Sequence, residues 1–384
     1  MNERRKPDWD PRSEDVLEDQ ISAYDEMREH CPVAFSELMQ WSVFRYEDVL
    51  SIIKDPERFG NGVSQHLNVP AGMDPPEHTA YRLIIDKYFR QERMDAFEPT
   101  CREIVINIIS NTLEDSELEL MADFARPFAV NTQCAFLGWP QNLQKTLADW
   151  TDRNYVATLA QDRQTMSDIA REFEAIVDEM CETRLKPIAK QEDDVTTSLL
   201  HEKVWGRELS NEEIASILRT WTVGEIGSIA SSVGILVHYL AEHNELQEKL
   251  RSDPSLLPPA IDEILRIHGP LVASRRITKC PVEINGKKID AGERISLNWI
   301  SANRDENVFE KPDNFRLDRD SSMNLLYGAG IHVCPGAPLA RMEMRVVLEE
   351  LLMHTIRIQL DSRKLPIKAR YPASGFAFLP VRIY

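Results

Sequence analysis

One cysteine stands among residues that could make it a reactive or metal-binding thiolate. The segment YGAGIHVCPG, residues 327–336, holds Cys334 between glycines and two residues after His332. A thiolate can act as a nucleophile, a redox centre, a zinc ligand or an iron ligand. Zinc needs about four ligands, and only His332 lies close, so a local zinc site is not expected. A Cys-His catalytic pair is also disfavoured, because the imidazole hardly reaches a sulfur two residues away in an extended segment.

The residues around Cys334 favour an axial iron ligand. The three glycines allow tight turns and close approach of backbone amides. Pro335 and Pro338 stand where an apolar-periodic helix is expected to begin, so Cys334 should lie just before a helix N-terminus. The free amides and the helix dipole at that point favour an anionic sulfur. A loop that presents one thiolate in this way suits a haem.

Two further pairs of polar side chains have helical spacing. Glu263 and Arg266 are three residues apart in PPAIDEILRIHGP, and His78 and Arg82 are four apart in DPPEHTAYR. Either spacing places both side chains on one helix face. Taken alone, each pair is typical of a solvated helix surface.

The cysteine loop resembles that of the cytochrome P-450 haem-thiolate monooxygenases, which reads Phe-Gly-x-Gly-x-His-x-Cys-x-Gly. The matching residues are Gly328, Gly330, His332, Cys334 and Gly336, and Tyr327 replaces the phenylalanine. The resemblance implies haem b (iron protoporphyrin IX) as cofactor, Cys334 as its iron ligand and O2 as oxidant. It also implies a fold that is mainly α with small β-sheets, shaped as a triangular prism.

The Glu-x-x-Arg pair resembles a structural network of the same family. In that reading Glu263 and Arg266 buttress the cysteine loop and perform no chemistry. The family has a third partner in the segment after the sheet. Arg316 and Arg319 are both candidates for it.

The resemblance assigns another set of side chains to the haem propionates, which are anions that need charge-assisted hydrogen bonds. His78, Arg82 and His332 match propionate-binding positions, and Arg276 is a fourth. Arg275 competes with Arg276 for that role.

The segment RTWTVGEIGSIASSVGI, residues 219–235, resembles the family's long helix over the distal haem face. Each glycine inside a helix costs about 1 kcal/mol relative to alanine, so Gly224 and Gly227 imply close packing or a nearby ligand. Ser228 falls where the family has a threonine that helps deliver protons, and Gly227 falls where it has an acid. Glu225 is the nearest carboxylate, either part of a proton relay or a structural group turned away from the haem.

The expected substrate is a small hydrophobic or aromatic molecule. By family position its pocket includes Trp221, Gly224, Val272, Ala273, Phe376 and Phe378. The segments VGEIGSIA, SRRI and YPASGFAFLPVRIY are similar to bacterial members served by phthalate-oxygenase-type reductases, several of which O-dealkylate methoxylated aromatics. This implies hydroxylation or O-demethylation of a small aromatic. A peroxide-driven peroxygenase and a non-catalytic haem-thiolate sensor are the alternatives.

Electrons are expected from a separate NAD(P)H-dependent partner, either a flavin/iron-sulfur reductase or a ferredoxin. No flavin, nicotinamide or iron-sulfur motif occurs in the 384 residues. Five basic side chains either form a docking patch for this partner or are scattered surface charges. They are Lys87, Arg90, Arg93, Arg341 and Arg345.

Composition limits the other partners. With 45 basic and 63 acidic residues the formal charge is −18, which disfavours nucleic acid as a partner. The charged N-terminus and the polar breaks in every uncharged run predict no membrane segment and a cytoplasmic protein. The other five cysteines are widely spaced and read as small buried residues.

The elements that position these residues follow from periodicity. Helices are expected over 102–113, 166–184, 211–241 and 337–355, and strands over 41–46, 282–289, 294–300 and the C-terminal FAFLPVRIY. Asn285-Gly286 should form a hairpin turn. No linker divides the chain, so residues 1–384 are expected to form a single domain.

Overall fold

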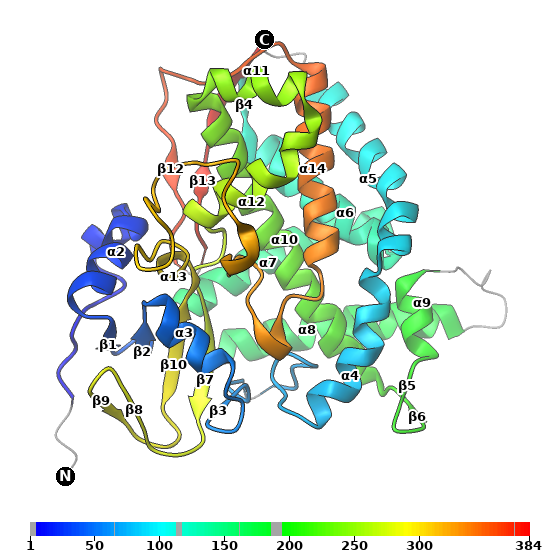
Figure 1. Cartoon of the computed structure of the whole chain (residues 1–384). Helices are drawn as coiled ribbons and strands as arrows, with labels where there is room; N and C mark the ends of the chain where they lie inside the picture. The colour runs from blue at the N-terminus through cyan, green and yellow to red at the C-terminus, as the bar shows by residue number, and fades with distance from the viewer. Residues whose placement is uncertain (1–4, 65, 113–116, 161, 186–193, 372) are drawn as a thin grey trace.

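The computed structural model describes residues 5–64, 66–112, 117–160, 162–185, 194–371 and 373–384 (Figure 1). Its α-helices are α1 Glu14–Glu18, α2 Gln20–His30, α3 Tyr46–Ile53, α4 Glu77–Ile85, α5 Gln91–Thr112, α6 Arg126–Leu137, α7 Gln144–Ala160, α8 Arg163–Leu185, α9 Val195–Leu200, α10 Asn211–Glu242, α11 Asn244–Ser252, α12 Leu257–Ile267, α13 Trp299–Ala302 and α14 Ala337–His354. Its strands are β1 Val33–Ser36, β2 Gln40–Val43, β3 Phe59–Gly60, β4 Glu117–Glu119, β5 Lys203–Val204, β6 Arg207–Glu208, β7 Ala273–Thr278, β8 Val282–Ile284, β9 Lys287–Ile289, β10 Arg294–Asn298, β11 Ile358–Leu360, β12 Ile367–Lys368, β13 Phe376–Phe378 and β14 Pro380–Ile383.

Helix α10 is the central element of the molecule (Figure 1). It begins at a capping box in which the Ser210 hydroxyl accepts from the Glu213 amide (3.2 Å) and the Glu213 carboxylate accepts from the Ser210 amide (2.7 Å). It is apolar on most of its circumference, as a buried helix must be, and it packs against α6, α8, α12 and α14. By length and composition it could cross a membrane, but 67% of its most apolar window is buried in this fold.

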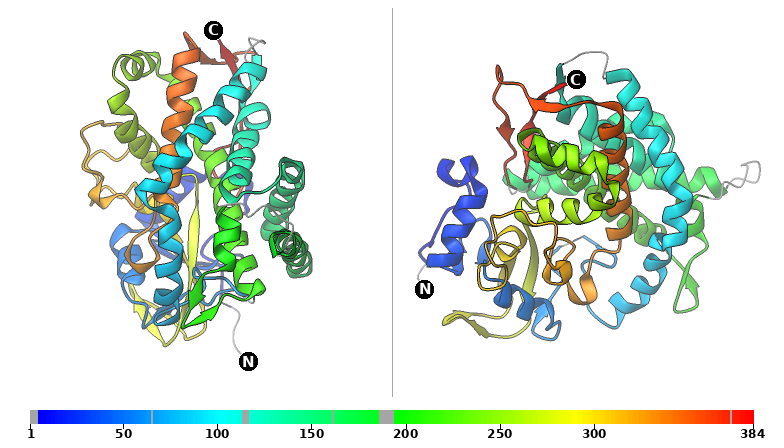
Figure 2. Two further views of the ribbon diagram at one scale, coloured as in Figure 1. Left: turned by 90° about the vertical axis from the view of Figure 1, so that its right-hand side faces the viewer. Right: turned by 45° about the horizontal axis from the view of Figure 1, so that its top comes forward.

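A small sheet lies to one side of the helices, at the lower left of Figure 1. Its strand order is β1-β2-β10-β7-β3, with β2 and β10 parallel and the other pairs antiparallel. The molecule is broad in Figure 1 and narrower when turned by 90° (Figure 2, left), so the helices and the sheet form a flattened prism.

The predicted elements agree with the observed ones except at their ends. The helices expected over 166–184, 211–241 and 337–355 are α8, α10 and α14. Helix α5 covers the helix expected over 102–113 and starts earlier, and Leu113 lies outside the described residues. The hairpin turn at Asn285-Gly286 is confirmed, with φ values of 47° and 74°.

Two strands are shorter than expected because a helix begins inside the predicted range. Strand β2 ends at Val43, and α3 starts at Tyr46. Strand β10 ends at Asn298, whose side chain accepts from the Ser301 amide at 2.9 Å and so caps α13.

A buried ion-pair network joins α12 to the segment after the sheet. Arg266 donates to both carboxylate oxygens of Glu263, at 2.7 and 3.0 Å, and to the carbonyls of Asn303 and Pro312, each at 2.7 Å. The third partner is Arg319, whose Nε donates to Glu263 at 2.8 Å.

Arg316 was the competing candidate for that third position, and its guanidinium points elsewhere. It pairs with Asp318 at the surface, at 3.1 Å, and only its backbone amide reaches Glu263, at 3.2 Å.

The network leads directly to the cysteine loop. Asn303, whose carbonyl accepts from Arg266, also accepts through its side chain from the Leu325 amide at 2.7 Å. Asn324 donates to the Asp262 carbonyl on α12 at 3.1 Å, and Asp262 pairs with Arg341 on α14. The loop is therefore held at its entrance by α12 and at its exit by α14.

We predict that replacing Arg266 will destabilise the protein far more than replacing Arg316. Arg266→Met leaves the buried Glu263 with only Arg319 and the Arg316 amide and removes the donor from two backbone carbonyls, a change that typically costs about 3–5 kcal/mol. Arg316→Met breaks a surface pair and should change little. Urea unfolding of the haem-bound protein measures both free energies, and equal losses in the two variants would contradict the buttress.

Candidate functional site

The cysteine loop folds back on itself through two left-handed residues. Gly328 and Gly330 have φ values of 72° and 66°, a conformation that favours glycine. The turn lets the Cys334 amide donate to the Tyr327 carbonyl at 2.8 Å. Helix α14 begins at Ala337, three residues after Cys334, as the two prolines predict.

The Cys334 sulfur lies deep among protein atoms, yet its side chain has accessible surface, so it faces an internal space. Burial raises the pKa of its thiol, while hydrogen bonds from the Gly336 and Ala337 amides lower it. Those donors would stabilise a thiolate once a cation is bound to it. Gly336 has φ of −78°, so close approach to the sulfur, not a left-handed turn, is its contribution.

Tyr327 carries the hydroxyl that distinguishes this loop from the family pattern. That hydroxyl is buried with no hydrogen-bond partner in the described part of the chain, and burial raises its pKa. The Arg341 guanidinium lies over the ring at 4.3 Å, a cation–π contact that anchors the loop to α14.

Three cationic or polar side chains converge beside the loop, and none of them forms an ion pair with a carboxylate in the described part of the chain. The rings of His78 and His332 lie 4.1 Å apart, although they are far apart in sequence. Both nitrogens of His78 and Nε2 of His332 are buried and have no hydrogen-bond partner among the described residues. Arg276 is buried, and burial lowers its pKa to about 10. Buried donors without partners are rare, so this arrangement points to a bound anionic group.

The two adjacent arginines of β7 differ in what they contact. Arg275 donates to the Tyr371 hydroxyl at 3.0 Å. Arg276 donates to the Arg275 carbonyl at 2.8 Å and forms no ion pair within the described residues. Both line one cavity of about 590 Å³ together with His332. Arg276 is buried, whereas Arg275 is only partly buried, and a buried cation has the greater need of a bound anion, which favours Arg276 as the anion ligand.

Arg82 is engaged with the protein itself. Its Nη1 donates to the Val333 carbonyl at 2.6 Å and the Ile331 carbonyl at 3.3 Å, and its Nε pairs with Asp86 at 2.5 Å. In this structure Arg82 therefore holds the cysteine loop against α4.

These residues fit a haem. One accessible sulfur faces an internal space, and unpaired donors of the kind that carboxylates require lie beside it. Opposite the loop, α10 has an exposed glycine, Gly224, with no described atom within 4 Å of the position of a Cβ. In this fit Cys334 would ligate the iron, and His78, His332 and Arg276 would hold the propionates.

Helix α10 presents different groups on its two flanks. Ser228, partly exposed, lies between them, and its carbonyl accepts from the Ser232 hydroxyl at 2.7 Å. Glu225 faces Glu343 of α14, and burial raises the pKa of Glu225 to about 7 and that of Glu343 well above its usual range. Two facing buried carboxyls share a proton to avoid like charges. This placement favours the structural interpretation of Glu225.

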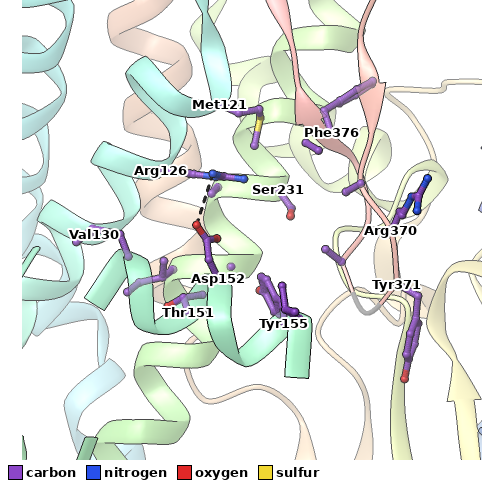
Figure 3. A pocket seen from close by; sticks show the side chains of 18 residues that line it. Met121, Arg126, Val130, Thr151, Asp152, Tyr155, Ser231, Arg370, Tyr371 and Phe376 are labelled. Carbon is purple, nitrogen blue, oxygen red and sulfur yellow. Dashed lines mark ion pairs between the residues drawn. The ribbon is translucent and has the colours of Figure 1, made fainter. Parts of the chain in front are cut away.

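The opposite flank of α10 lines a cavity of about 230 Å³ bounded by α7 and the β12-β13 region (Figure 3). Gly227 faces it, and the phenol of Tyr155 on α7 lies against this glycine. Sequence reasoning missed Tyr155, because no local pattern relates it to Gly227.

The expected substrate-pocket residues do not gather in one place. Phe376 lines the cavity of Figure 3, whereas Phe378 does not. Trp221 is buried instead among Tyr88, Phe89 and Phe136.

The two positions expected on β7 and just before it also differ. Val272 is fully buried in a core cluster around Tyr24, and Ala273 is partly exposed at the start of β7. Leu271, just before these two residues, is 42% exposed and forms an isolated β-bridge with Ala373.

The five cations of the expected docking patch are mostly paired. Lys87 pairs with Glu202, Arg341 with Asp262 and Arg345 with Glu98. Arg93 stacks over Tyr88 at 5.0 Å. The cations at this surface alternate with carboxylates, which favours scattered charge over a basic patch.

Comparison with known proteins places this site in context. The sequence profile of the cytochrome P-450 family matches residues 100–382. A putative cytochrome P-450, YjiB of Bacillus subtilis, is 32% identical over 86% of this chain and 85% of its own length. The erythromycin C-12 hydroxylase of Saccharopolyspora erythraea is 30% identical over 87% of each chain. The crystal structure of CYP109E1 from Bacillus megaterium with testosterone superposes with a TM-score of 0.83 at 27% identity, covering 97% of this chain and 99% of that one.

We predict that Arg276→Leu will weaken haem binding and that Arg275→Leu will not. Loss of a charge-assisted hydrogen bond typically costs about 1.5–3 kcal/mol, or roughly a 10–150-fold rise in dissociation constant. Haemin titration of the haem-free protein, followed by absorbance, measures both constants. A larger loss for Arg275→Leu would reverse the assignment.

Proposed function

The chain belongs to the cytochrome P-450 family, and on that premise we propose that it oxidises a small aromatic substrate, by hydroxylation or by O-demethylation of a methoxyl group. As a family member it is a haem-thiolate monooxygenase. The observation that carries the proposal is the accessible Cys334 sulfur at the start of α14, beside the unpartnered imidazole nitrogens of His78 and His332 and the buried guanidinium of Arg276.

The reaction sets what the protein must provide. Haem, when bound, supplies the activation of O2 by two electrons and two protons. One oxygen atom enters the substrate and the other leaves as water. For a methoxyl group, hydroxylation of the methyl carbon gives a hemiacetal that collapses to the phenol and formaldehyde. The Gly336 and Ala337 amides tune the sulfur, the loop network holds it in place, and α10 covers the opposite side.

The size of one cavity beside α10 supports a small substrate. The cavity next to Gly227 and Phe376 measures about 230 Å³, below the roughly 300–1,000 Å³ common for ligand pockets, so a substrate that enters it must be small. The cavity of about 590 Å³ beside His332 and Arg276 is the space in which this proposal places the haem. One relative is named for the hydroxylation of erythromycin, and another was crystallised with testosterone. Both of these molecules are larger than a methoxylated phenol. Family membership therefore does not transfer their substrates to this chain.

Electrons come from a separate partner in this proposal, a flavin/iron-sulfur reductase or a ferredoxin, and the protein works in the cytoplasm. A peroxygenase is the second candidate, favoured by one observation: position 227 is glycine, and Glu225 faces α14. Peroxide brings both oxygen atoms already reduced, so that reaction depends less on proton delivery.

We expect turnover with NADH and a reductase to exceed turnover with hydrogen peroxide. Product formed per haem is measured under both conditions at equal haem concentration. Faster turnover with peroxide alone would favour the peroxygenase. Substrate binding without product under either condition would indicate a sensor. Cys334→Ser is the control that removes the thiolate from both reactions.

We expect a methoxylated phenol to shift the haem spectrum to high spin and to yield formaldehyde. The shift reports displacement of water from the substrate side, and formaldehyde reports O-demethylation. The unmethylated phenol is the matched control, since it can bind but cannot release formaldehyde. Failure of every methoxyaromatic in a panel to shift the spectrum would contradict the substrate class.

A further inference from the structure

The proposed monooxygenase reaction, on which this inference rests, needs two protons on the α10 side of the site for each O2 cleaved. Glu225 does not face the cavity on that side. Residues two apart on a helix differ by about 200° around its axis, and Glu225 faces Glu343 while Gly227 faces the cavity. Another group must therefore connect Ser228 with solvent.

Tyr155 occupies the space beside Gly227. A Cβ built on Gly227 would overlap the Tyr155 hydroxyl and lie 2.7 Å from its Cζ. Tyr155 and Gly227 thus belong to one packing unit across α7 and α10. The phenol fills the volume that any side chain at position 227 would need, and it brings an oxygen atom to the residue next to Ser228.

The Tyr155 hydroxyl is free to exchange hydrogen bonds. It has no protein hydrogen-bond partner within the described part of the chain, and it lines the 230 Å³ cavity with Asp152 and Ser231 (Figure 3). Asp152, exposed at the cavity, pairs with Arg126 at 3.8 Å. Polar side chains on the wall of this cavity therefore come from both α7, with Asp152 and Tyr155, and α10, with Ser231.

We propose that Tyr155 passes protons from this cavity to Ser228, in place of an acidic side chain at position 227. The hydroxyl accepts a proton from cavity water at its oxygen and gives its own proton to the Ser228 side, so the phenol is unchanged after each transfer. Tyr155 acts through Ser228 and is a positioning residue rather than a catalytic one.

The chemistry of a phenol suits this role. Burial raises the pKa of Tyr155 to about 12, with the charge of Asp152 acting in the same direction and that of Arg126 opposing it. The group therefore stays protonated at neutral pH and serves as both donor and acceptor. Because the phenol stays neutral, it does not attract a cation into the cavity.

The first test removes only the hydroxyl. In Tyr155→Phe the product formed per NADH should fall at least about fivefold, and hydrogen peroxide per NADH should rise, because slow protonation releases reduced oxygen before it is cleaved. The solvent deuterium isotope effect on turnover should also change. The control is Thr151→Val, one turn earlier on α7, whose hydroxyl is already bonded to the Leu147 carbonyl at 2.9 Å.

The second test returns an acid to the vacated space. Tyr155→Ala combined with Gly227→Asp should recover coupling relative to Tyr155→Ala alone. An independent readout is stability. Gly227→Ala should lower the melting temperature of the haem-bound wild type by about 2–6 °C through overpacking, and should cost little in the Tyr155→Ala background.

The outcomes separate this inference from the proposed function. Peroxide and NADH are measurable with any ligand that stimulates NADH oxidation, so a wrong substrate class leaves the test intact. One contrary outcome is unchanged peroxide release in Tyr155→Phe while Gly227→Ala still destabilises the wild type more than it destabilises Tyr155→Ala. That combination would make Tyr155 a space-filling residue and overturn the relay. A weakened substrate spectral shift with unchanged coupling would make it a substrate contact, which also overturns it.

Discussion

A sulfur atom that is to carry negative charge inside a protein must be surrounded by hydrogen-bond donors and held rigidly, and most of the structure serves that requirement. The amides of Gly336 and Ala337 at the start of α14 point toward Cys334. They do so only because the preceding turn reverses at Gly328 and Gly330. The position of the loop depends on α12 and α14 at either end and on Arg82 of α4, which donates to the Ile331 and Val333 carbonyls.

Arg266 makes that position reproducible. Its guanidinium bonds a carboxylate on its own helix and two carbonyls of a segment far along the chain. Removing one partner from such a cluster leaves an uncompensated charge in a low-dielectric environment, and this is strongly destabilising. The cluster therefore keeps one fixed geometry. Asn303 then transmits the fixed geometry to the backbone just before the loop. The ion pair thus acts at a distance through ordinary hydrogen bonds.

Features written in consecutive residues could be predicted from the sequence, and features created by tertiary packing could not. The cysteine loop, the start of α14, the Glu263–Arg266 pair and the Asn285-Gly286 turn depend on neighbours in the chain. Choosing Arg319 over Arg316 required knowing how the segment after the sheet turns back to α12. The choice between Arg275 and Arg276 depended on which guanidinium the fold buries, here that of Arg276, while Arg275 reaches Tyr371. The pocket residues also depend on tertiary packing, which buries Trp221 and Val272 in separate core clusters.

The contact between Tyr155 and Gly227 also couples two positions that lie far apart in the chain. A side chain at position 227 requires the Tyr155 ring to move or to be replaced by a smaller group. The effects of substitutions at the two positions should therefore not be additive. A library that varies one of them alone samples only the side chains that are compatible with the residue kept at the other.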